Sequence, residues 1–330
     1  MNSIKMKNNK KLCVVGAGKW GSNHIKTLDS MGALGGIVEK NVTSSKKIKD
    51  LYPLSKVFNN LSEAIGQDFD GYVVATPPST HFEVAKTIIN SRKPVLVEKP
   101  LALNYESAFE LNELAKRKKV LLMVGHILLF HSGFNKMKEI IDSGKIGDVQ
   151  YIYSNRLNLG TFRDDENVFW SFAPHDISLF NYFFGKEPSK LTSRGLDILQ
   201  KGIHDTTITT LEYNNKKMGH IFVSWLHPFK EHRFVIVGSN GMLHFEDSLE
   251  NKPLKFYDKK AEFVDSVFKP SSGDVTSIKY PKTEPLKNEL QYFISNLDKN
   301  KVKIANGDSA VNVIKILEQA TKSLKKNSES

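Results

Sequence analysis

The stretch Val14-Val15-Gly16-Ala17-Gly18-Lys19-Trp20-Gly21 decides the fold of the first part of this chain. It places a Gly-x-Gly-x-x-Gly turn directly after an apolar run and directly before a helical pattern. In such a turn the first glycine permits the tight bend, the second lets a pyrophosphate approach the backbone, and the third lets helix and strand pack closely. We therefore predict that Gly16, Gly18, Lys19, Trp20 and Gly21 bind a dinucleotide, and we prefer this interpretation to a plain strand–turn–helix.

An acidic residue follows at the position that this kind of fold uses for the cofactor's ribose. Glu39 ends the next apolar run, Leu34 to Val38, about 20 residues after the glycines. Its carboxylate can accept hydrogen bonds from the ribose diol and would repel a 2′-phosphate. The sequence therefore predicts NAD as the cofactor, with NADP less favoured, although Lys40 places a cation beside the carboxylate.

The composition is that of an ordinary globular chain with room for two domains. It has 330 residues, 40% of them apolar and 25% charged, and no apolar run approaches the ~18 residues of a membrane span. Residues 1–10 are basic and lack the apolar core of a signal peptide, so we predict a disordered leader on a cytoplasmic protein. We assign residues 11–126 to a dinucleotide-binding domain and residues 127–330 to a substrate and oligomerisation domain.

The formal net charge of +11 raises the question of nucleic-acid binding. Four of these charges belong to Lys5, Lys7, Lys10 and Lys11, and the tail from Lys322 adds two more net. The remaining excess is spread thinly and forms no basic-aromatic array, which suits steering of an anionic small molecule as well as it suits DNA. We therefore expect neither a nucleic-acid nor a membrane partner.

Two patterns of secondary structure follow one another along the chain. Up to Gly125, short apolar strands alternate with helical segments, which is typical of a parallel sheet covered on both faces. Beyond Gly125, the runs Ile203 to Tyr213, Met218 to Trp225, Arg233 to Gly238 and Met242 to Glu246 succeed one another without helical crossovers. We therefore predict an α/β Rossmann domain followed by an α+β domain with a mainly antiparallel, open sheet. Amphipathic helices at Leu286 to Leu297 and Ala310 to Leu324 are expected to close the second domain.

Two polar segments lie where strands of the predicted parallel sheet end. Ala75-Thr76-Pro77-Pro78-Ser79-Thr80-His81 follows one strand, and Glu98-Lys99-Pro100 ends the next. Ligands of such sheets bind at the carboxyl edge of the strands. A lysine there, flanked by a glutamate and a proline, can have its position and pKa set by its neighbours. Without the neighbouring segments, a solvated strand end explains Lys99 as well as a catalytic role does.

Together these segments resemble the glucose-fructose oxidoreductase/inositol dehydrogenase (Gfo/Idh/MocA) family over nearly the whole chain. The resemblance rests on the glycine turn, on Ala75-Thr76-Pro77-Pro78 with His81, on Glu98-Lys99-Pro100, and on His175-Asp176 with Gly185 after an aromatic helix. It implies NAD or NADP as hydride carrier, with Thr76, Pro77, His81, Glu98 and Lys99 on the cofactor side. It also implies Lys99 and His175 as the catalytic pair at a sugar carbinol, and a homo-oligomer formed through the open sheet.

One position departs from the family pattern. Many members carry an aspartate four residues before the histidine, where this chain has Ser171, so Lys99 and His175 are left to divide the proton handling. The surrounding residues resemble the branch that oxidises nucleotide-linked amino sugars at C3, such as UDP-N-acetylglucosamine 3-dehydrogenase. The resemblance implies substrate contacts from these residues: Arg156, Asn158, Arg163, Asn167, Trp170, Ser171 and His175.

Other interpretations of these residues stay open. Trp170 suits a core position and a sugar platform about equally, and Arg156 and Arg163 can pair with the acidic run Asp164 to Glu166 instead of a phosphate. The chain lacks a His-Glu-x-x-His motif and has one cysteine, Cys13, so we expect no metal. Oxidation or reduction of an unactivated sugar or cyclitol is an alternative activity, and a non-catalytic NAD-binding sensor is the alternative from another class.

Overall fold

The computed structural model describes residues 10–271 and 273–328, so the predicted leader lies outside the described residues except for Lys10. The Lys10 Nζ lies 3.1 Å from a carboxylate oxygen of Asp70. The described chain forms two compact units, the first ending at Ile127 and taking back Glu284–Ile314. The second contains Leu128–Thr283 and the chain from Lys315 onward.

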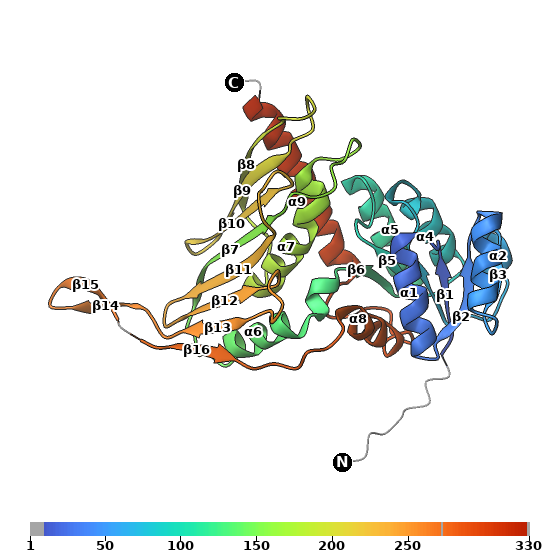
Figure 1. Ribbon diagram of the computed structural model, residues 1–330, viewed down its shortest axis with the longest axis horizontal. Coiled ribbons are helices and arrows are strands. Elements are labelled where there is room, and N and C mark those ends of the chain that lie inside the picture. Colours follow the sequence, from blue (N-terminus) through green and yellow to red (C-terminus); the bar gives the residue numbers. More distant parts are fainter. Residues whose placement is uncertain (1–9, 272, 329–330) are drawn as a thin grey trace, which may run out of the picture. The chain divides into compact units, whose positions relative to one another are not determined.

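The first unit is built on a six-stranded parallel sheet with the order β3-β2-β1-β4-β5-β6 (Figure 1). This order is that of the dinucleotide-binding fold, whose ligand site lies where the order reverses, between β1 and β4. The strands are β1 Leu12–Val15, β2 Leu34–Val38, β3 Lys56–Phe58, β4 Gly71–Val74, β5 Val95–Glu98 and β6 Leu122–Gly125. The helices between them are α1 Lys19–Ser30, α2 Val42–Leu51, α3 Leu61–Ile65, α4 His81–Asn90 and α5 Tyr105–Lys118.

Burial and capping explain why these segments fold as they do. The strands β1, β4, β5 and β6 are buried along their whole length, as expected for strands covered on both faces. Asparagine side chains at Asn41, Asn60 and Asn104 each accept a hydrogen bond from a backbone N–H in the first turn of α2, α3 and α5. Such caps satisfy N–H groups that the helix itself leaves without a partner.

The chain returns to the first unit through α8 Pro285–Ile294, which the sequence placed in the second domain. Leu290, Phe293 and Ile294 of this helix are buried, and α8 packs against α1. Beyond α8, the backbone N–H of Val124 donates to the carbonyl of Ala305 at 2.8 Å, which extends the edge of the sheet. The division into residues 11–126 and 127–330 therefore has to be corrected for residues 284–314.

The second unit is built on an eight-stranded sheet with the order β16-β13-β12-β11-β7-β10-β9-β8 (Figure 1). Its strands are β7 Val149–Leu157, β8 Lys190–Leu196, β9 Thr206–Tyr213, β10 Lys217–Ser224, β11 Glu231–Gly238, β12 Met242–Glu246, β13 Leu254–Tyr257 and β16 Val275–Ile278. All neighbouring pairs are antiparallel except β7 and β10, which run parallel. The predicted fold class, a Rossmann domain with a mainly antiparallel second sheet, is confirmed.

Helices cover one face of this sheet. The helix α7 Val168–Phe184 packs on β7, β9 and β10, and α6 Ser132–Asp142 packs on β12. The last helix, α9 Gly307–Ser328, begins in the first unit and continues in the second. A separate hairpin, β14 Ala261–Val264 and β15 Val267–Pro270, extends from β13 and β16 and is exposed along both strands (Figure 1).

Candidate functional site

The glycine turn of the first unit has the shape that a pyrophosphate requires. Gly16 has φ +93°, and a Cβ at Gly21 would lie 2.1 Å from the Gly16 carbonyl oxygen, so neither position accommodates a side chain. A Cβ at Gly18, by contrast, would meet no atom within 4 Å. Gly18 is the N-cap of α1, and open space at a helix N-terminus is where an anion binds. Lys19 and Trp20 follow as the first residues of α1 and are both exposed.

The carboxylate of Glu39 is hydrogen-bonded to the glycine turn. One oxygen accepts from the Ala17 N–H at 3.0 Å, and the other accepts from the Asn41 N–H at 2.8 Å. Each carboxylate oxygen has a further lone pair, so Glu39 can still accept hydrogen bonds from a ribose diol. Lys40 is exposed beside it. The residues present therefore fit NAD, with the glycine turn for the pyrophosphate and Glu39 for the ribose.

Glu98 joins the end of β5 to α1. Its Oε1 accepts a short hydrogen bond from the Trp20 indole N–H and lies 2.6 Å from the His24 Nε2, and its Oε2 accepts from the Lys99 N–H at 3.2 Å. Glu98 is 7% exposed as a residue, and His24 is fully buried. His24 therefore binds the carboxylate at the end of β5 from the buried side of α1.

Lys99 stands at the carboxyl end of β5, where the Lys99–Pro100 peptide is cis. His81 connects this strand end to the end of β4, because its Nδ1 lies 2.8 Å from the Pro100 carbonyl and its Nε2 lies 2.8 Å from the Thr76 carbonyl. His81 is 1% exposed. The structure therefore gives it a role in shaping two loops at the cofactor edge. Thr76 also accepts a hydrogen bond from the Thr80 hydroxyl through its own side chain, at 2.8 Å.

Pro77 caps the short 3-10 helix Pro78–Thr80 that precedes α4. Thr76 and Pro77 form the turn after β4, and β4 is the neighbour of β1 in the sheet. A Cβ at Gly16 would lie 3.0 Å from the Thr76 methyl group, so the two turns are in contact. The sequence-predicted cofactor residues of the first unit thus lie on adjacent strand ends of one sheet.

Two buried titratable groups of the first unit were not assigned a role from the sequence. His126 directly follows β6, and burial together with the charge of Lys99 lowers its pKa to about 4. Glu289 on α8 is fully buried, and burial together with the charge of Glu98 raises its pKa well above the usual value. His126 was visible in the sequence as a residue near the last Rossmann strand. No sequence pattern pointed to Glu289, because its burial depends on residues 284–314 folding back into the first unit.

In the second unit, Arg156 is held by an aspartate. Its Nε donates to Asp176 Oδ2 at 2.8 Å and a terminal nitrogen donates to Oδ1 at 3.1 Å, with side-chain exposures of 12% and 1%. Burial opposes the charged guanidinium, but Asp176 outweighs it and the pKa of Arg156 is raised. The same guanidinium helps burial to lower the pKa of His232 to about 3. The paired partner of Arg156 is thus Asp176, not the acidic run after Arg163.

The other predicted substrate residues serve different structural purposes. Asn167 is the N-cap of α7 and accepts from the N–H groups of Phe169 and Trp170. The Trp170 indole donates to the Thr321 hydroxyl at 2.9 Å, which fixes the ring against α9. Arg163 is half-exposed, with Glu166 at 3.5 Å. The backbone N–H of Asn158 donates to the Ser224 carbonyl at 3.0 Å.

Ser171 and His175 lie one turn apart on α7, so their side chains share a face of the helix. Ser171 is 9% exposed and His175 is half-buried. The helix begins at Val168 and runs through Pro174. This continuity places both residues on one rigid element.

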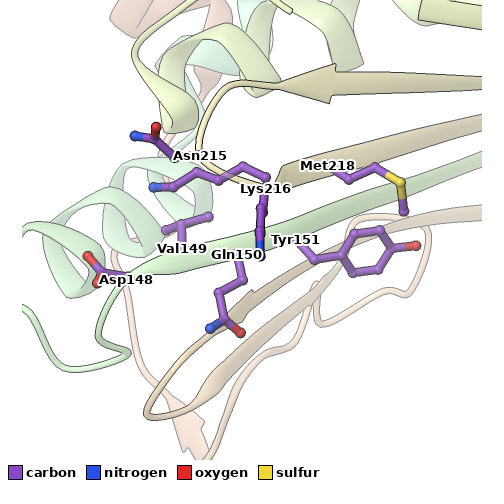
Figure 2. Close-up of a pocket in the computed structure, with 8 residues that line it drawn as sticks. Asp148, Val149, Gln150, Tyr151, Asn215, Lys216 and Met218 are labelled. Atoms are coloured by element: carbon purple, nitrogen blue, oxygen red, sulfur yellow. The ribbon is translucent and has the colours of Figure 1, made fainter.

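A pocket of the second unit lies away from these residues. It is lined by Asp148 to Tyr151 at the start of β7 and by Asn215 to Met218 at the turn into β10 (Figure 2). It contains none of the sequence-predicted site residues. Within the described ranges no three His, Cys, Asp or Glu side chains gather in a way that could hold a metal ion. Nor does any described helix have the length and apolarity needed to cross a membrane.

Comparisons with known proteins agree with the fold. Residues 10–126 match the model of an oxidoreductase family with an NAD-binding Rossmann fold, and residues 134–244 match the Gfo/Idh/MocA C-terminal domain. The chain belongs to the Gfo/Idh/MocA family of NAD-binding oxidoreductases. The resemblance that the sequence motifs indicated is therefore confirmed, and so is NAD as the family's cofactor.

Individual relatives are distant. An uncharacterised oxidoreductase of Streptococcus pneumoniae is 28% identical over 58% of this chain, which spans little more than half (56%) of that relative's length. The inositol 2-dehydrogenase of Rhizobium meliloti is 22% identical over 94% of this chain and 96% of its own length. Among solved structures, the UDP-N-acetylglucosamine 3-dehydrogenase GnnA of Acidithiobacillus ferrooxidans aligns with a TM-score of 0.84 and 21% identity, covering 96% and 97% of the two chains. At this identity the structural likeness shows the fold.

Proposed function

We propose that the chain is an NAD-dependent dehydrogenase that oxidises a sugar carbinol, with C3 of UDP-N-acetylglucosamine or a related nucleotide sugar as substrate. The observation that carries this proposal is the position of Lys99 at a strand end of the same sheet as the open cradle at Gly18. A lysine amine at the carboxyl edge of the nucleotide-binding sheet is well placed for proton transfer.

The proposed chemistry divides hydride and proton. NAD, when bound, supplies the acceptor for the hydride that leaves the carbinol carbon. The hydroxyl proton goes to the neutral amine of Lys99 or the neutral imidazole of His175, and the C–O bond becomes a carbonyl. Glu98 fixes the strand end through the Lys99 N–H, and α7 fixes the position of His175. Ser171 cannot supply the negative charge of an aspartate, so no carboxylate at that position supports His175.

Three observations favour a nucleotide sugar. The residues from Trp170 to Ser178 resemble the 3-dehydrogenase branch, the fold aligns with GnnA, and the net charge is positive. Arg163 is the more available arginine for a diphosphate, because Arg156 is already paired with Asp176. Guanidinium groups suit diphosphates since they donate paired hydrogen bonds in a plane. Because inositol dehydrogenases are among the relatives, a free cyclitol is the second candidate substrate.

The test is incubation of the protein with NAD, each candidate substrate and a trap for the ketone, followed by mass analysis. We expect UDP-N-acetylglucosamine to lose two hydrogens. Free N-acetylglucosamine should be turned over more slowly, because binding energy from the remote nucleotide is then lost at the reacting carbon. Oxidation of inositol or a free sugar with no change in the nucleotide sugars would favour the cyclitol alternative. NAD binding without any turnover would favour a sensor.

We also propose a homo-oligomer formed through the open face of the eight-stranded sheet. Helices pack on one face, while the other carries half-exposed apolar side chains such as Ile208 on β9 and Met218 on β10, with Tyr153 and Val235 on the next strands, β7 and β11. Apolar faces of this kind mark protein–protein contacts. A mass measurement in solution tests the proposal, and Ile208→Lys with Met218→Lys should reduce the assembled fraction.

A further inference from the structure

The buried carboxyl group of Glu289 lies within electrostatic reach of a second carboxyl group, that of Glu98. Glu289 is fully buried on α8, and no hydrogen-bond partner to either of its oxygens is found among the described residues. The charge of Glu98 acts on it within the same unit, and α8 packs on α1, the helix that contributes Trp20 and His24 to Glu98. An ionised carboxylate in such surroundings has neither solvent nor donors to stabilise it.

Glu98 is in the opposite situation. It receives hydrogen bonds from the Trp20 indole and the Lys99 N–H, and His24 Nε2 lies at 2.6 Å. It is also closely packed, because a Cβ at Gly125 would lie 3.0 Å from its carboxyl carbon. Hydrogen bonds to a carboxylate favour the ionised form, and two buried carboxyl groups that repel each other electrostatically do not both ionise at neutral pH. The proton therefore belongs on Glu289.

We propose that Glu289 keeps its proton in the folded protein and acts as a positioning residue for Glu98. A neutral Glu289 leaves Glu98 as the single anion that ties Trp20 and His24 of α1 to the strand end bearing Lys99. Ionisation of Glu289 would repel Glu98 and loosen its hold on the Lys99 N–H. The other titratable groups around Glu98 are His24 on α1 and Lys99 after β5, and His126 after β6 feels the charge of Lys99. The link from Glu289 to catalysis rests on the proposed role of Lys99. The protonation state of Glu289 is independent of that role.

The first test compares the thermal unfolding of Glu289→Gln with the unmodified protein from pH 5 to pH 8, without cofactor. A carboxyl group whose pKa is raised on folding makes the folded state bind more protons than the unfolded state, so stability falls as pH rises above the usual pKa of about 4.5. Glutamine cannot ionise. The Tm of the variant should therefore rise relative to the unmodified protein, by at least about 2 °C over this range. Glu106→Gln, at an exposed position of α5, is the matched control and should show no such trend.

The second test reads the proton directly. Infrared difference spectra at pH 7 between the unmodified protein and Glu289→Gln should show loss of the C=O stretch of a protonated carboxyl group. In the enzyme assay, kcat of the variant should hold at alkaline pH where the unmodified protein declines, with KM for NAD unchanged. A Tm difference that is flat with pH, or no protonated carboxyl band, would overturn the proposal. Since both of these readouts use the protein without substrate, absence of the proposed dehydrogenase activity would leave them unaffected.

Discussion

At the scale of single residues, Lys99→Ala is expected to lower turnover by about two to four orders of magnitude, the usual effect of removing a positioned acid–base group. Affinity for NAD should change little, because the glycine turn and Glu39 do not depend on the Lys99 side chain. Steady-state kinetics and a binding titration measure the two effects. Lys49→Ala, at an exposed position of α2, is the control. Near-normal turnover of the Lys99 variant at saturating substrate would refute its role in proton handling.

The glycines of the turn should separate binding from folding. Gly18→Ala meets no atom of the protein within 4 Å, so it should keep the Tm while weakening NAD binding by at least about tenfold. Gly21→Ala drives a methyl group to 2.1 Å from the Gly16 carbonyl and should lower the Tm as well. Calorimetry and NAD titration on both variants check this. Equal loss of stability in the two variants would contradict the assigned roles.

Glu39 should set the preference for NAD over NADP, because its carboxylate would face a 2′-phosphate with the same sign of charge. Glu39→Ala should narrow the ratio of the two dissociation constants, and NAD affinity itself should fall since the Ala17 and Asn41 N–H groups lose their acceptor. Titration with both cofactors measures the ratio, with Glu83→Ala as an exposed control. Equal affinities in the unmodified protein would remove the basis of this prediction.

At the scale of elements, the Arg156–Asp176 pair connects β7 to α7, and both side chains are largely buried. Asp176→Ala leaves an uncompensated guanidinium, so it should cost about 3–5 kcal/mol in the free energy of unfolding. The double variant Arg156→Met with Asp176→Leu should recover most of that loss. The exposed pair Lys190–Glu212 is the matched control, and breaking it should cost less than about 1 kcal/mol. Denaturant unfolding of these variants and of the unmodified protein checks the prediction, and a small loss for Asp176→Ala would mean that water reaches the pair.

The elements also show where sequence reasoning succeeds and where it stops. The parallel strands were predictable because Val, Ile and Leu runs such as Leu12–Val15 are buried on both faces, and the glycines because their spacing reflects steric needs of the turn. The start of α7 was not predictable, because a proline such as Pro174 usually marks a helix boundary. In the structure the helix begins after its cap at Asn167 and continues past Pro174. The partners of Arg156 and Glu98 depend on contacts distant in sequence, which local patterns do not encode.

At the scale of the whole molecule, two histidines should lower stability on acidification, a contribution opposite in sign to that of Glu289. His126 and His232 are held neutral, with pKa values lowered mainly by burial to about 4 and about 3. An unfolded chain binds protons at these histidines below pH ~6.5 while the folded chain does not, so the free energy of unfolding decreases as pH falls. Between pH 6.5 and 4, His126 alone should account for about 3 kcal/mol. Unfolding curves for His126→Gln should show a shallower pH dependence, and an unchanged slope would contradict the prediction.

The return of residues 284–314 to the first unit has a consequence for synthesis on the ribosome. When residue 127 has emerged, the six strands of the first sheet are all available, yet the helix that covers α1 has not been translated. At about 5–20 residues per second, the intervening segment takes roughly 8–30 s to appear. During this interval the nascent Rossmann unit exposes the apolar surface that Leu290 and Phe293 later bury. Nascent chains stalled before α8 should therefore be protease-sensitive and bind chaperones, and chains stalled well past residue 314 should not.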